Sequence, residues 1–128
     1  HNDYRNYMTL KGAIRMAKID RLSEKIEKLG KKQNLGALLK MVEDPEDEIR
    51  LAVAKAMGQI NSYESGMHLI PLFRDPSPMV RAAAAESAGM INAKHCEEYV
   101  KKLAFADSDP NVRQVAKTAF DRLKDSVV

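Results

Sequence analysis

Apolar residues recur at helical spacing in three segments of the chain, and each segment follows a turn that contains an aspartate. The turns begin at Asp44, Asp75 and Asp107, which lie 31 and 32 residues apart. Repetition at a fixed period of some tens of residues predicts an array of stacked units rather than a single globular core. The three apolar faces that we expect to be buried comprise Ile49, Val53, Ala56, Met57 and Ile60, then Val80, Ala84, Ser87, Ala88 and Ile91, then Val112, Ala116, Ala119, Phe120 and Leu123.

Each turn carries signals for the start of a helix. Asp-Pro occurs at residues 44–45 and 75–76, and Pro110 follows Asp107. Proline suits the first turn of a helix, and an aspartate side chain can accept hydrogen bonds from the amides that follow, so we expect a helix just after each aspartate. A further helix precedes each turn. The sequence thus predicts three helical hairpins at 34–60, 65–91 and 95–125, in one all-α domain over residues 1–128.

Residues 4–29 are expected to form a helical segment with two different apolar faces. Tyr7, Leu10, Ile14 and Ala17 share one stripe, whereas Ile19, Leu22, Ile26 and Leu29 lie on another, more than a quarter turn away at about 100° per residue. The second stripe fits the repeat register and the first does not. We therefore expect a capping helix or a kinked helix pair, whose first half either folds back or contacts another chain, with self-association as one possibility.

The repeated phrase resembles the HEAT repeat. The shared features are Asp-Pro, then Ile-Arg or Val-Arg, then an Ala-rich helix that ends near Gly and Ile, preceded by a helix such as residues 35–42. The period is shorter than the roughly 40–47 residues usual for HEAT units, so the chain looks more like the short class found in phycobilisome-lyase-type proteins. The resemblance covers about residues 34–123. It implies a right-handed α-solenoid of about three HEAT-like hairpins, preceded by the N-terminal helical segment.

Three arginines recur together with the turn aspartates. A ladder of arginines could bind phosphates, but the resemblance implies instead that Asp–Arg pairs link neighbouring units. Such pairing would also neutralise the positive charge that binding of nucleic-acid phosphates requires. The members of this expected structural ladder are Asp44, Arg50, Asp75, Arg81, Asp107 and Arg113.

Some positions of the second helices vary between copies while the apolar positions stay nearly constant. In HEAT arrays this helix lines the concave side, and variation on a fixed frame is how solenoids build a binding surface. Leu51, Met79 and Met90 are expected to be exposed apolar residues of this surface. The alternative is that they are scattered surface side chains without a binding role. The predicted concave-face residues are Glu48, Leu51, Lys55, Gln59, Met79, Ala82, Glu86, Met90, Asn111, Gln114, Thr118 and Arg122.

Composition and charge narrow the remaining possibilities. No apolar run approaches the roughly 20 residues of a membrane span, and one cysteine, Cys96, cannot form an internal disulfide, which suits a cytoplasmic location. Residues 1–33 carry a net charge of +5 and the repeats −2, so the solenoid itself is not basic. The basic N-terminal residues, which could touch nucleic acid or an acidic partner, are Lys11, Arg15, Lys18, Lys25, Lys28, Lys31 and Lys32.

No catalytic constellation is visible in the sequence. His95-Cys96-Glu97-Glu98 contains metal-ligand types, but only His95 and Glu98 share a helix face, so we expect no metal and no cofactor. Lys117 and Asp121 replace the small residues of the earlier copies, which predicts a polar end to the array.

The sequence thus favours a non-catalytic protein-interaction module. The alternatives are an accessory subunit of a lyase or other prosthetic-group enzyme, and nucleic-acid binding through the basic segment.

Overall fold

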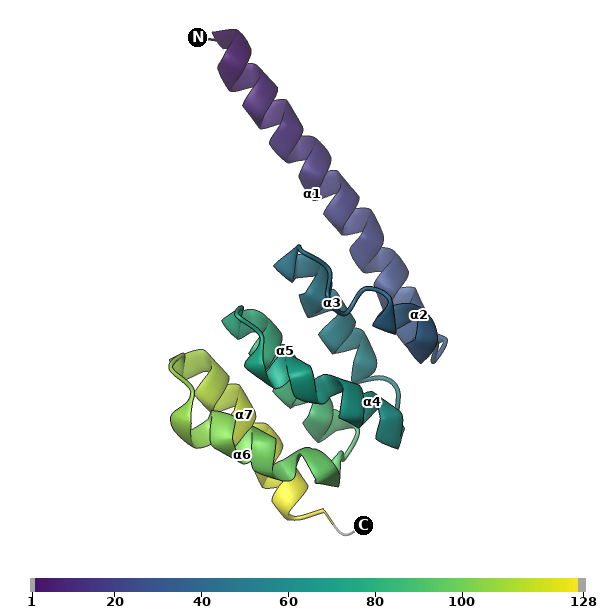
Figure 1. Ribbon diagram of the computed structural model, residues 1–128, viewed down its shortest axis with the longest axis vertical. Coiled ribbons are helices and arrows are strands. Elements are labelled where there is room, and N and C mark those ends of the chain that lie inside the picture. The colour runs from purple at the N-terminus through teal and green to yellow at the C-terminus, as the bar shows by residue number, and fades with distance from the viewer. Residues whose placement is uncertain (1, 127–128) are drawn as a thin grey trace.

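The computed structural model describes residues 2–126, and within this range every regular element is a helix (Figure 1). We expected one domain over residues 1–128, and residues 1, 127 and 128 lie outside the described part of the chain. The elements in order are α1 (Asn2–Lys31), α2 (Leu35–Leu39), α3 (Asp47–Met57), α4 (Tyr63–Leu69), the 3₁₀ helix η1 (Ile70–Arg74), α5 (Pro78–Met90), the 3₁₀ helix η2 (Lys94–Cys96), α6 (Glu97–Ala106) and α7 (Pro110–Lys124).

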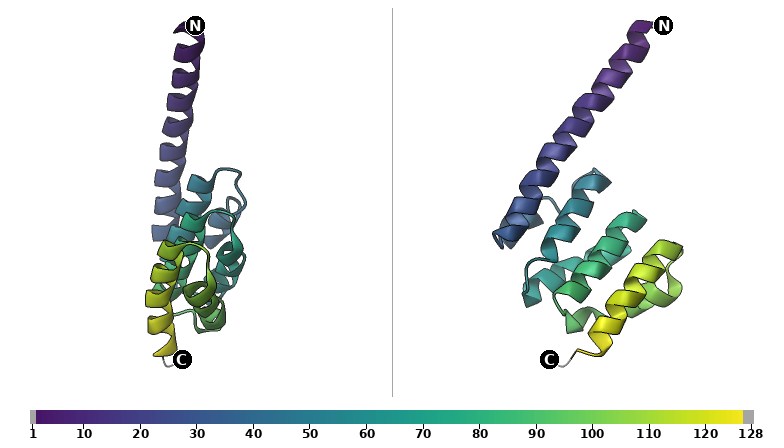
Figure 2. Two further views of the ribbon diagram at one scale, coloured as in Figure 1. Left: turned by 90° about the vertical axis from the view of Figure 1, so that its left-hand side faces the viewer. Right: turned by 180° about the vertical axis from the view of Figure 1, so that it is seen from behind.

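The helices form two layers. We call α1, α3, α5 and α7 the inner helices; they stand side by side in this order (Figure 2). The outer layer contains α2, then α4 with η1, then η2 with α6, and each of its members belongs to the same hairpin as the inner helix that follows it. The predicted all-α solenoid is confirmed.

The core between the layers is almost wholly aliphatic. Each hairpin contributes fully buried side chains from both of its helices, as Leu38 and Val53 do in the first. The inner helices approach closely through small residues: a methyl group added at Gly89 would lie 3.1 Å from the Cβ of Ala119. Aliphatic and small side chains therefore set the spacing between hairpins.

Each turn aspartate lies two residues before the N-cap position at which we expected it to cap the helix. Each side chain accepts a hydrogen bond from the amide two residues later, as in Ser77 N to Asp75 Oδ1 at 3.0 Å, and each inner helix begins three residues after its aspartate. The residue before a proline favours extended backbone, so the aspartate of an Asp-Pro turn stands outside the helix. Each inner helix thus begins just after its aspartate, as predicted, with a short turn between the two.

The outer helices are also shorter than expected. The sequence predicted a helix over residues 35–42, but α2 ends at Leu39 and the chain continues in turns. In the second hairpin α4 gives way to the 3₁₀ helix that contains Pro71. Proline has no N–H to donate to a carbonyl four residues earlier, so the α-helical pattern cannot continue through it.

Helix α1 is continuous, so the predicted kink is absent. Ile19 is its first buried residue, and Figure 1 shows the preceding half projecting beyond the hairpins. At the boundary the guanidinium of Arg15 pairs with the carboxylates of Glu46, at 2.6 Å, and Glu48, at 3.6 Å. No proline interrupts the segment, so the change of apolar face takes place within one helix.

Bidentate ion pairs connect successive turns. Arg50 Nε donates to Asp75 Oδ2 at 2.8 Å, and Arg81 Nε donates to Asp107 Oδ2 at 2.9 Å; in each pair Nη2 reaches the other carboxylate oxygen at 3.1 Å. Each arginine also donates from Nη1 to the carbonyl of its own turn aspartate. One guanidinium thus joins two consecutive turns.

The two ends of this series differ from its middle. Arg113 Nη1 donates to the Asp107 carbonyl at 2.7 Å, and no carboxylate among the described residues forms an ion pair with it. The Asp44 carboxylate accepts a hydrogen bond from the Glu46 amide at 2.9 Å and from no arginine side chain of the described chain. Two Asp–Arg pairs therefore join the three hairpins of the described chain.

The environment lowers the pKa of the Asp75 carboxyl. Burial by itself would raise it, but the hydrogen bond from Arg50, the Ser77 amide and the nearby positive charge outweigh burial. Asp107 behaves in the same way beside Arg81. Because the folded pKa values lie below the ordinary one, the stability that these groups contribute is present above about pH 4 and is lost as the pH falls through the folded values.

We predict that Arg81→Met destabilises the fold by about 3 kcal/mol, because it leaves the buried Asp107 carboxylate unpaired. The same substitution at Arg113 should cost less than about 1 kcal/mol, since no carboxylate loses a partner. Urea denaturation followed by circular dichroism measures both. In acid the difference between Arg81→Met and the wild type should shrink as the pH falls through the lowered pKa of Asp107, because this carboxyl then protonates in either protein. Equal costs for the two arginines would contradict the linking role of the pair.

A second prediction compares two glycines of α1. A Cβ at Gly30 would lie 2.9 Å from the Ala56 Cβ and 3.0 Å from its carbonyl oxygen, whereas a Cβ at Gly12 would meet nothing within 4 Å. Gly30→Ala should therefore destabilise the protein by about 1–3 kcal/mol through overpacking. Gly12→Ala should raise helix content without harm, since alanine is favoured over glycine by about 1 kcal/mol in a helix. Thermal melts would show opposite shifts; a stabilised Gly30→Ala variant would refute the close approach of α1 and α3.

Candidate interaction surface

The inner helices leave a hollow between α1 and α3 on the side away from the outer layer. Its volume is about 470 Å³, and every residue around it comes from these two helices or the turn after α3. Half-buried Leu51 and Ala52 belong to its apolar part, together with the buried Ala56. The residues that line it are Met16, Ile19, Asp20, Ser23, Glu27, Glu48, Leu51, Ala52, Lys55, Ala56 and Gln59.

A second hollow lies between α5 and α7 on the same face, with a volume of about 580 Å³. Its polar groups are mainly uncharged amides and a hydroxyl, with one acid and one base. It is lined by Glu86, Met90, Asn111, Gln114, Val115, Thr118, Ala119 and Arg122. We call the surface that carries the two hollows the inner face.

The structure brings most of the predicted concave-face residues to these hollows. Glu48, Leu51, Lys55 and Gln59 surround the first, and the second is lined by Glu86, Met90, Asn111, Gln114, Thr118 and Arg122.

Three predicted residues depart from expectation. Met79 is 50% exposed but lies outside both hollows, at the start of α5. Leu51 is half-buried rather than exposed. Ala82 is buried, with 7% exposure, because its methyl group is too short to project from between the neighbouring inner helices; its assignment to the accessible surface was wrong.

Helix α1 contributes residues to the first hollow that the sequence argument missed. Asp20, Ser23 and Glu27 line it together with Met16. Asp20 stands 31 residues before Leu51, so extending the repeat register into α1 would have placed it on this face.

The first hollow is acidic. Three carboxylates, Asp20, Glu27 and Glu48, line it, against a single Lys55. Glu48 Oε2 is shielded from solvent and accepts no hydrogen bond from the described residues, although the Arg15 guanidinium lies 3.6 Å away. The inner face therefore favours cationic groups at its α1 end.

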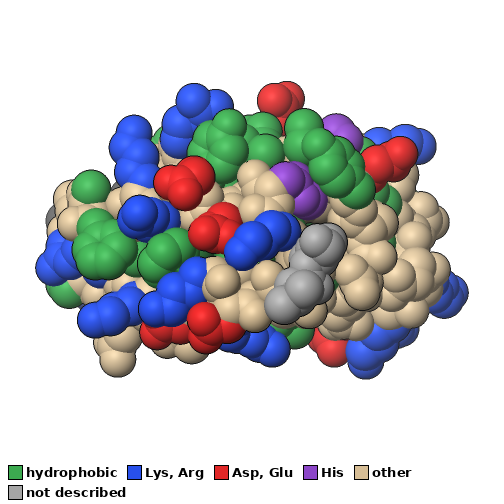
Figure 3. Space-filling view, turned by 90° about the horizontal axis from the view of Figure 1, so that it is seen from below, with side chains coloured by type: hydrophobic (Ala, Val, Ile, Leu, Met, Phe, Trp, Pro, Cys, Tyr) green, Lys and Arg blue, Asp and Glu red, His purple; other side chains and the backbone are tan. Residues whose placement is uncertain are grey.

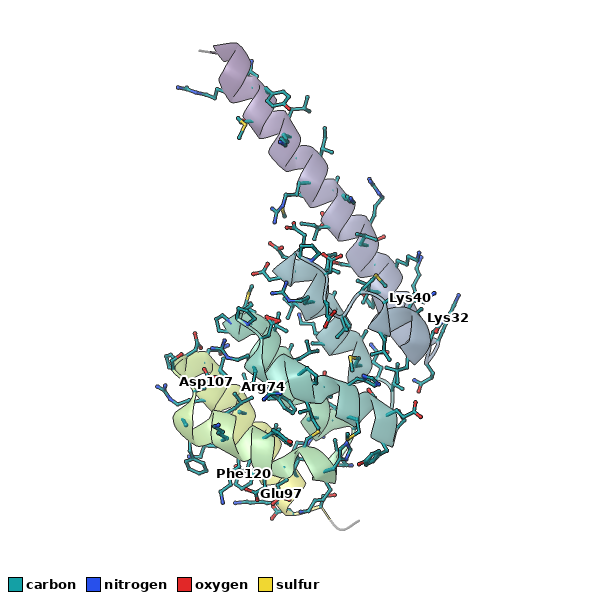
Figure 4. All side chains as sticks on the ribbon, in the orientation of Figure 1. Lys32, Lys40, Arg74, Glu97, Asp107 and Phe120 are labelled. Atoms are coloured by element: carbon teal, nitrogen blue, oxygen red, sulfur yellow. The ribbon has the colours of Figure 1, made fainter. Side chains whose placement is uncertain are left out.

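The outer layer carries a separate hollow of about 670 Å³ between η1 and α6. Phe73 and Tyr99 lie with their ring centroids 6.1 Å apart, and Arg74 and Lys102 add positive charge. Figure 4 shows Arg74 and Asp107 at this part of the molecule. The repeat pattern gave no signal for this hollow, because its residues do not occupy varying positions of the second helices.

The residues with reactive or metal-binding chemistry are occupied in packing. The Cys96 thiol is buried and donates to the Gly66 carbonyl at 3.3 Å, and burial raises its pKa from 9.0 to about 11. His95 stacks on Tyr63 with the ring centroids 4.2 Å apart. Within the described chain no three His, Cys, Asp or Glu side chains are grouped so that they could hold a metal ion.

The end of the array at α7 is polar. Lys117 and Asp121 are exposed there. Figure 3, which views the molecule from below, shows basic and acidic side chains interspersed on that side.

Comparison with known proteins identifies repeats in the same places as the hairpins. A family model described as HEAT repeats matches residues 66–128, and another described as HEAT repeat matches residues 35–63. No curated protein matches the chain. Among residues 2–126, no helix has the length and apolar character needed to cross a membrane.

We predict that Cys96 reacts slowly with a disulfide reagent in the folded protein. A rise of the pKa from 9.0 to about 11 leaves about a hundredfold less thiolate at pH 8, and burial hinders access further. The rate of thionitrobenzoate release from native protein should therefore be at least about a hundredfold below that of urea-denatured protein. Equal rates would mean that Cys96 is accessible.

Proposed function

Because the chain belongs to the HEAT repeat family, we propose that it is a protein-interaction module whose inner face binds a segment of another protein. HEAT repeats are commonly protein-interaction scaffolds, and the family is typically non-catalytic. The fold alone does not choose a partner, so the proposal depends on the residues of the inner face.

One observation carries the proposal: the second-helix positions that differ from repeat to repeat supply four of the eleven residues around the first hollow and six of the eight around the second. The buried framework stays nearly the same in each copy, as at the equivalent positions Ile49, Val80 and Val112. Lys55, Glu86 and Thr118 occupy one equivalent position and differ in charge. A constant frame with a varied accessible surface suits recognition of an extended partner.

The two hollows favour different parts of such a partner. At the first, an apolar side chain could contact Leu51 and Ala52, while a neighbouring Lys or Arg would face Asp20, Glu27 and Glu48. At the second, Asn111 and Gln114 offer amide donors and acceptors to a peptide backbone. The acidic character of the first hollow disfavours nucleic-acid phosphates at this face.

We predict that a double substitution on the inner face abolishes capture of the partner. Glu27→Lys and Met90→Glu change one exposed residue at each hollow, and neither side chain is part of the buried core. The first change removes an acid that would face a cationic group of the partner. The intact chain and this variant would serve as baits in lysate from the source cell, with bound proteins identified by mass spectrometry. A partner retained by the wild type should be reduced at least about tenfold on the variant.

A matched control repeats the same two changes on the outer layer, as Glu98→Lys and Met67→Glu. Both positions are exposed, and Glu98 lines the outer hollow. Circular dichroism should first show that all three baits are equally helical. Loss of the partner on the control alone would move the binding site to the outer layer and overturn the proposal, as would equal capture by all three baits.

A further inference from the structure

The first half of α1 is a helix without a neighbour. Every residue from 5 to 18 is exposed, including Tyr7, Leu10 and Ile14 at 59%, 61% and 61%. Figure 4 shows the side chains of this half projecting on all sides of the ribbon. Large apolar side chains cost free energy when they are exposed to water. Three of them on one stripe need an explanation that isolated exposed residues do not.

The exposed stripe belongs to a longer line of residues on one side of α1. Steps of three or four residues lead from Tyr7, Leu10, Ile14 and Ala17 onward to Arg21, Lys25 and Lys28. We call these seven residues the α1 seam. The seam is apolar over its first half and basic over its second, and it is turned away from the stripe of Ile19 and Ile26 that is buried in the array.

The charge around the seam is mainly positive. Residues 5–18 contain four cations and no acid. Arg15 pairs with Glu46, and Lys11 and Lys18 share a shallow hollow with Asp44 and Glu46. Arg21, Lys25 and Lys28, by contrast, are exposed and form no ion pair with any described carboxylate. Among the acids of the second half of α1, Asp20 and Glu27 point elsewhere, because they line the inner hollow. Glu24 is exposed beside the seam, one turn from Arg21 and from Lys28, and forms no ion pair with a described residue.

This charge pattern selects among possible occupants. A second copy aligned in parallel would place Arg21, Lys25 and Lys28 against themselves, and an antiparallel copy would bring further cations beside the apolar stripe. Nucleic-acid phosphates would suit the basic half but not Leu10 and Ile14. A membrane surface would bury the apolar stripe for only about three turns before the same seam turns basic. A partner that is apolar in one half and acidic in the other fits both halves.

We propose that the α1 seam binds an acidic amphipathic helix of another protein. Its apolar residues would cover Tyr7, Leu10 and Ile14, and its carboxylates would face Arg21, Lys25 and Lys28. The seam spans 22 residues, about 33 Å at 1.5 Å per residue, which is six turns of a partner helix.

The helix is prepared for such a partner. Its second half is anchored on α3, so the free half continues a helix that is already nucleated. Carboxylates from a partner would offset the positive charge of the seam at Arg21, Lys25 and Lys28.

The test uses a synthetic acidic peptide of about 24 residues, a length that supports helix formation. Leucine occupies its seam positions in one half and glutamate in the other, and a control peptide carries lysine in place of every glutamate. Fluorescence anisotropy with the labelled peptides measures binding to the full chain. We expect the acidic peptide to bind at least tenfold more tightly than the basic one, with an affinity that falls as salt is raised.

Two variants locate the binding site. Leu10→Asp with Ile14→Asp should weaken binding of the acidic peptide about tenfold or more, and Arg21→Gln with Lys25→Gln and Lys28→Gln should weaken it and flatten its salt dependence. Phe105→Asp is the control, because Phe105 is 66% exposed on α6, in the third hairpin. Circular dichroism should show equal helix content. Unchanged affinity in both α1 variants, or no binding by the wild type, overturns the proposal.

The other occupants give distinct results, each of which also overturns the proposal. Sedimentation equilibrium of the protein alone would reveal a dimer that Leu10→Asp with Ile14→Asp dissociates. Co-sedimentation with phosphatidylcholine–phosphatidylserine vesicles, or binding to a labelled single-stranded oligonucleotide, in the absence of peptide binding would identify an anionic lipid surface or a nucleic acid instead. None of these measurements involves the inner face, so they do not bear on binding there.

Discussion

The bidentate contact between an arginine of one hairpin and the turn aspartate of the next is the constraint on which the array depends. Each guanidinium satisfies the carboxylate of the following turn and the carbonyl of its own turn, as Arg50 does with Asp75 and Asp44. The carboxylate in turn accepts a hydrogen bond from the backbone amide just before the next inner helix. One planar group thus fixes the distance and orientation of two turns, and the inner helices that start from these turns are aligned as a result.

Close approach of the inner helices completes the frame. Ser87 donates to the Ala54 carbonyl at 2.6 Å, and a methyl group at Gly58 would lie 2.6 Å from the same serine oxygen. Such tight contacts leave little freedom at the framework positions. Positions that face outward, such as Lys55 and Glu86, lie outside these contacts, so they can vary without disturbing the stack. The rigidity of the frame and the variety of the inner face therefore have the same structural origin.

Helix α1 separates charge between two surfaces. It serves as the first inner helix, yet no Asp–Arg pair joins it to α3, and Arg15 with Glu46 occupies that junction instead. Its acids Asp20 and Glu27 line the inner hollow, whereas its seam cations lie on another side of the helix. A single helix can thus present an acidic surface to one partner and a basic, partly apolar surface to another, and the two proposed sites do not compete for the same side chains.

The sequence by itself determined the helical class, the three hairpins and most of the residues that α3, α5 and α7 contribute to the inner face, because these follow from local periodicity and from repetition at 31 and 32 residues. It did not determine the burial of Ala82, the half-burial of Leu51, the continuity of α1 or the hollow near Phe73. Those depend on how closely neighbouring helices approach and on which side chains of distant segments cover one another. The two stripes of α1 illustrate the limit: the pattern shows that they face different ways, but a helix whose second half is anchored can carry an exposed stripe on its first half without bending. Only the packed structure, in which Ile19 is the first residue of α1 to be buried, decides between a kink and a straight helix.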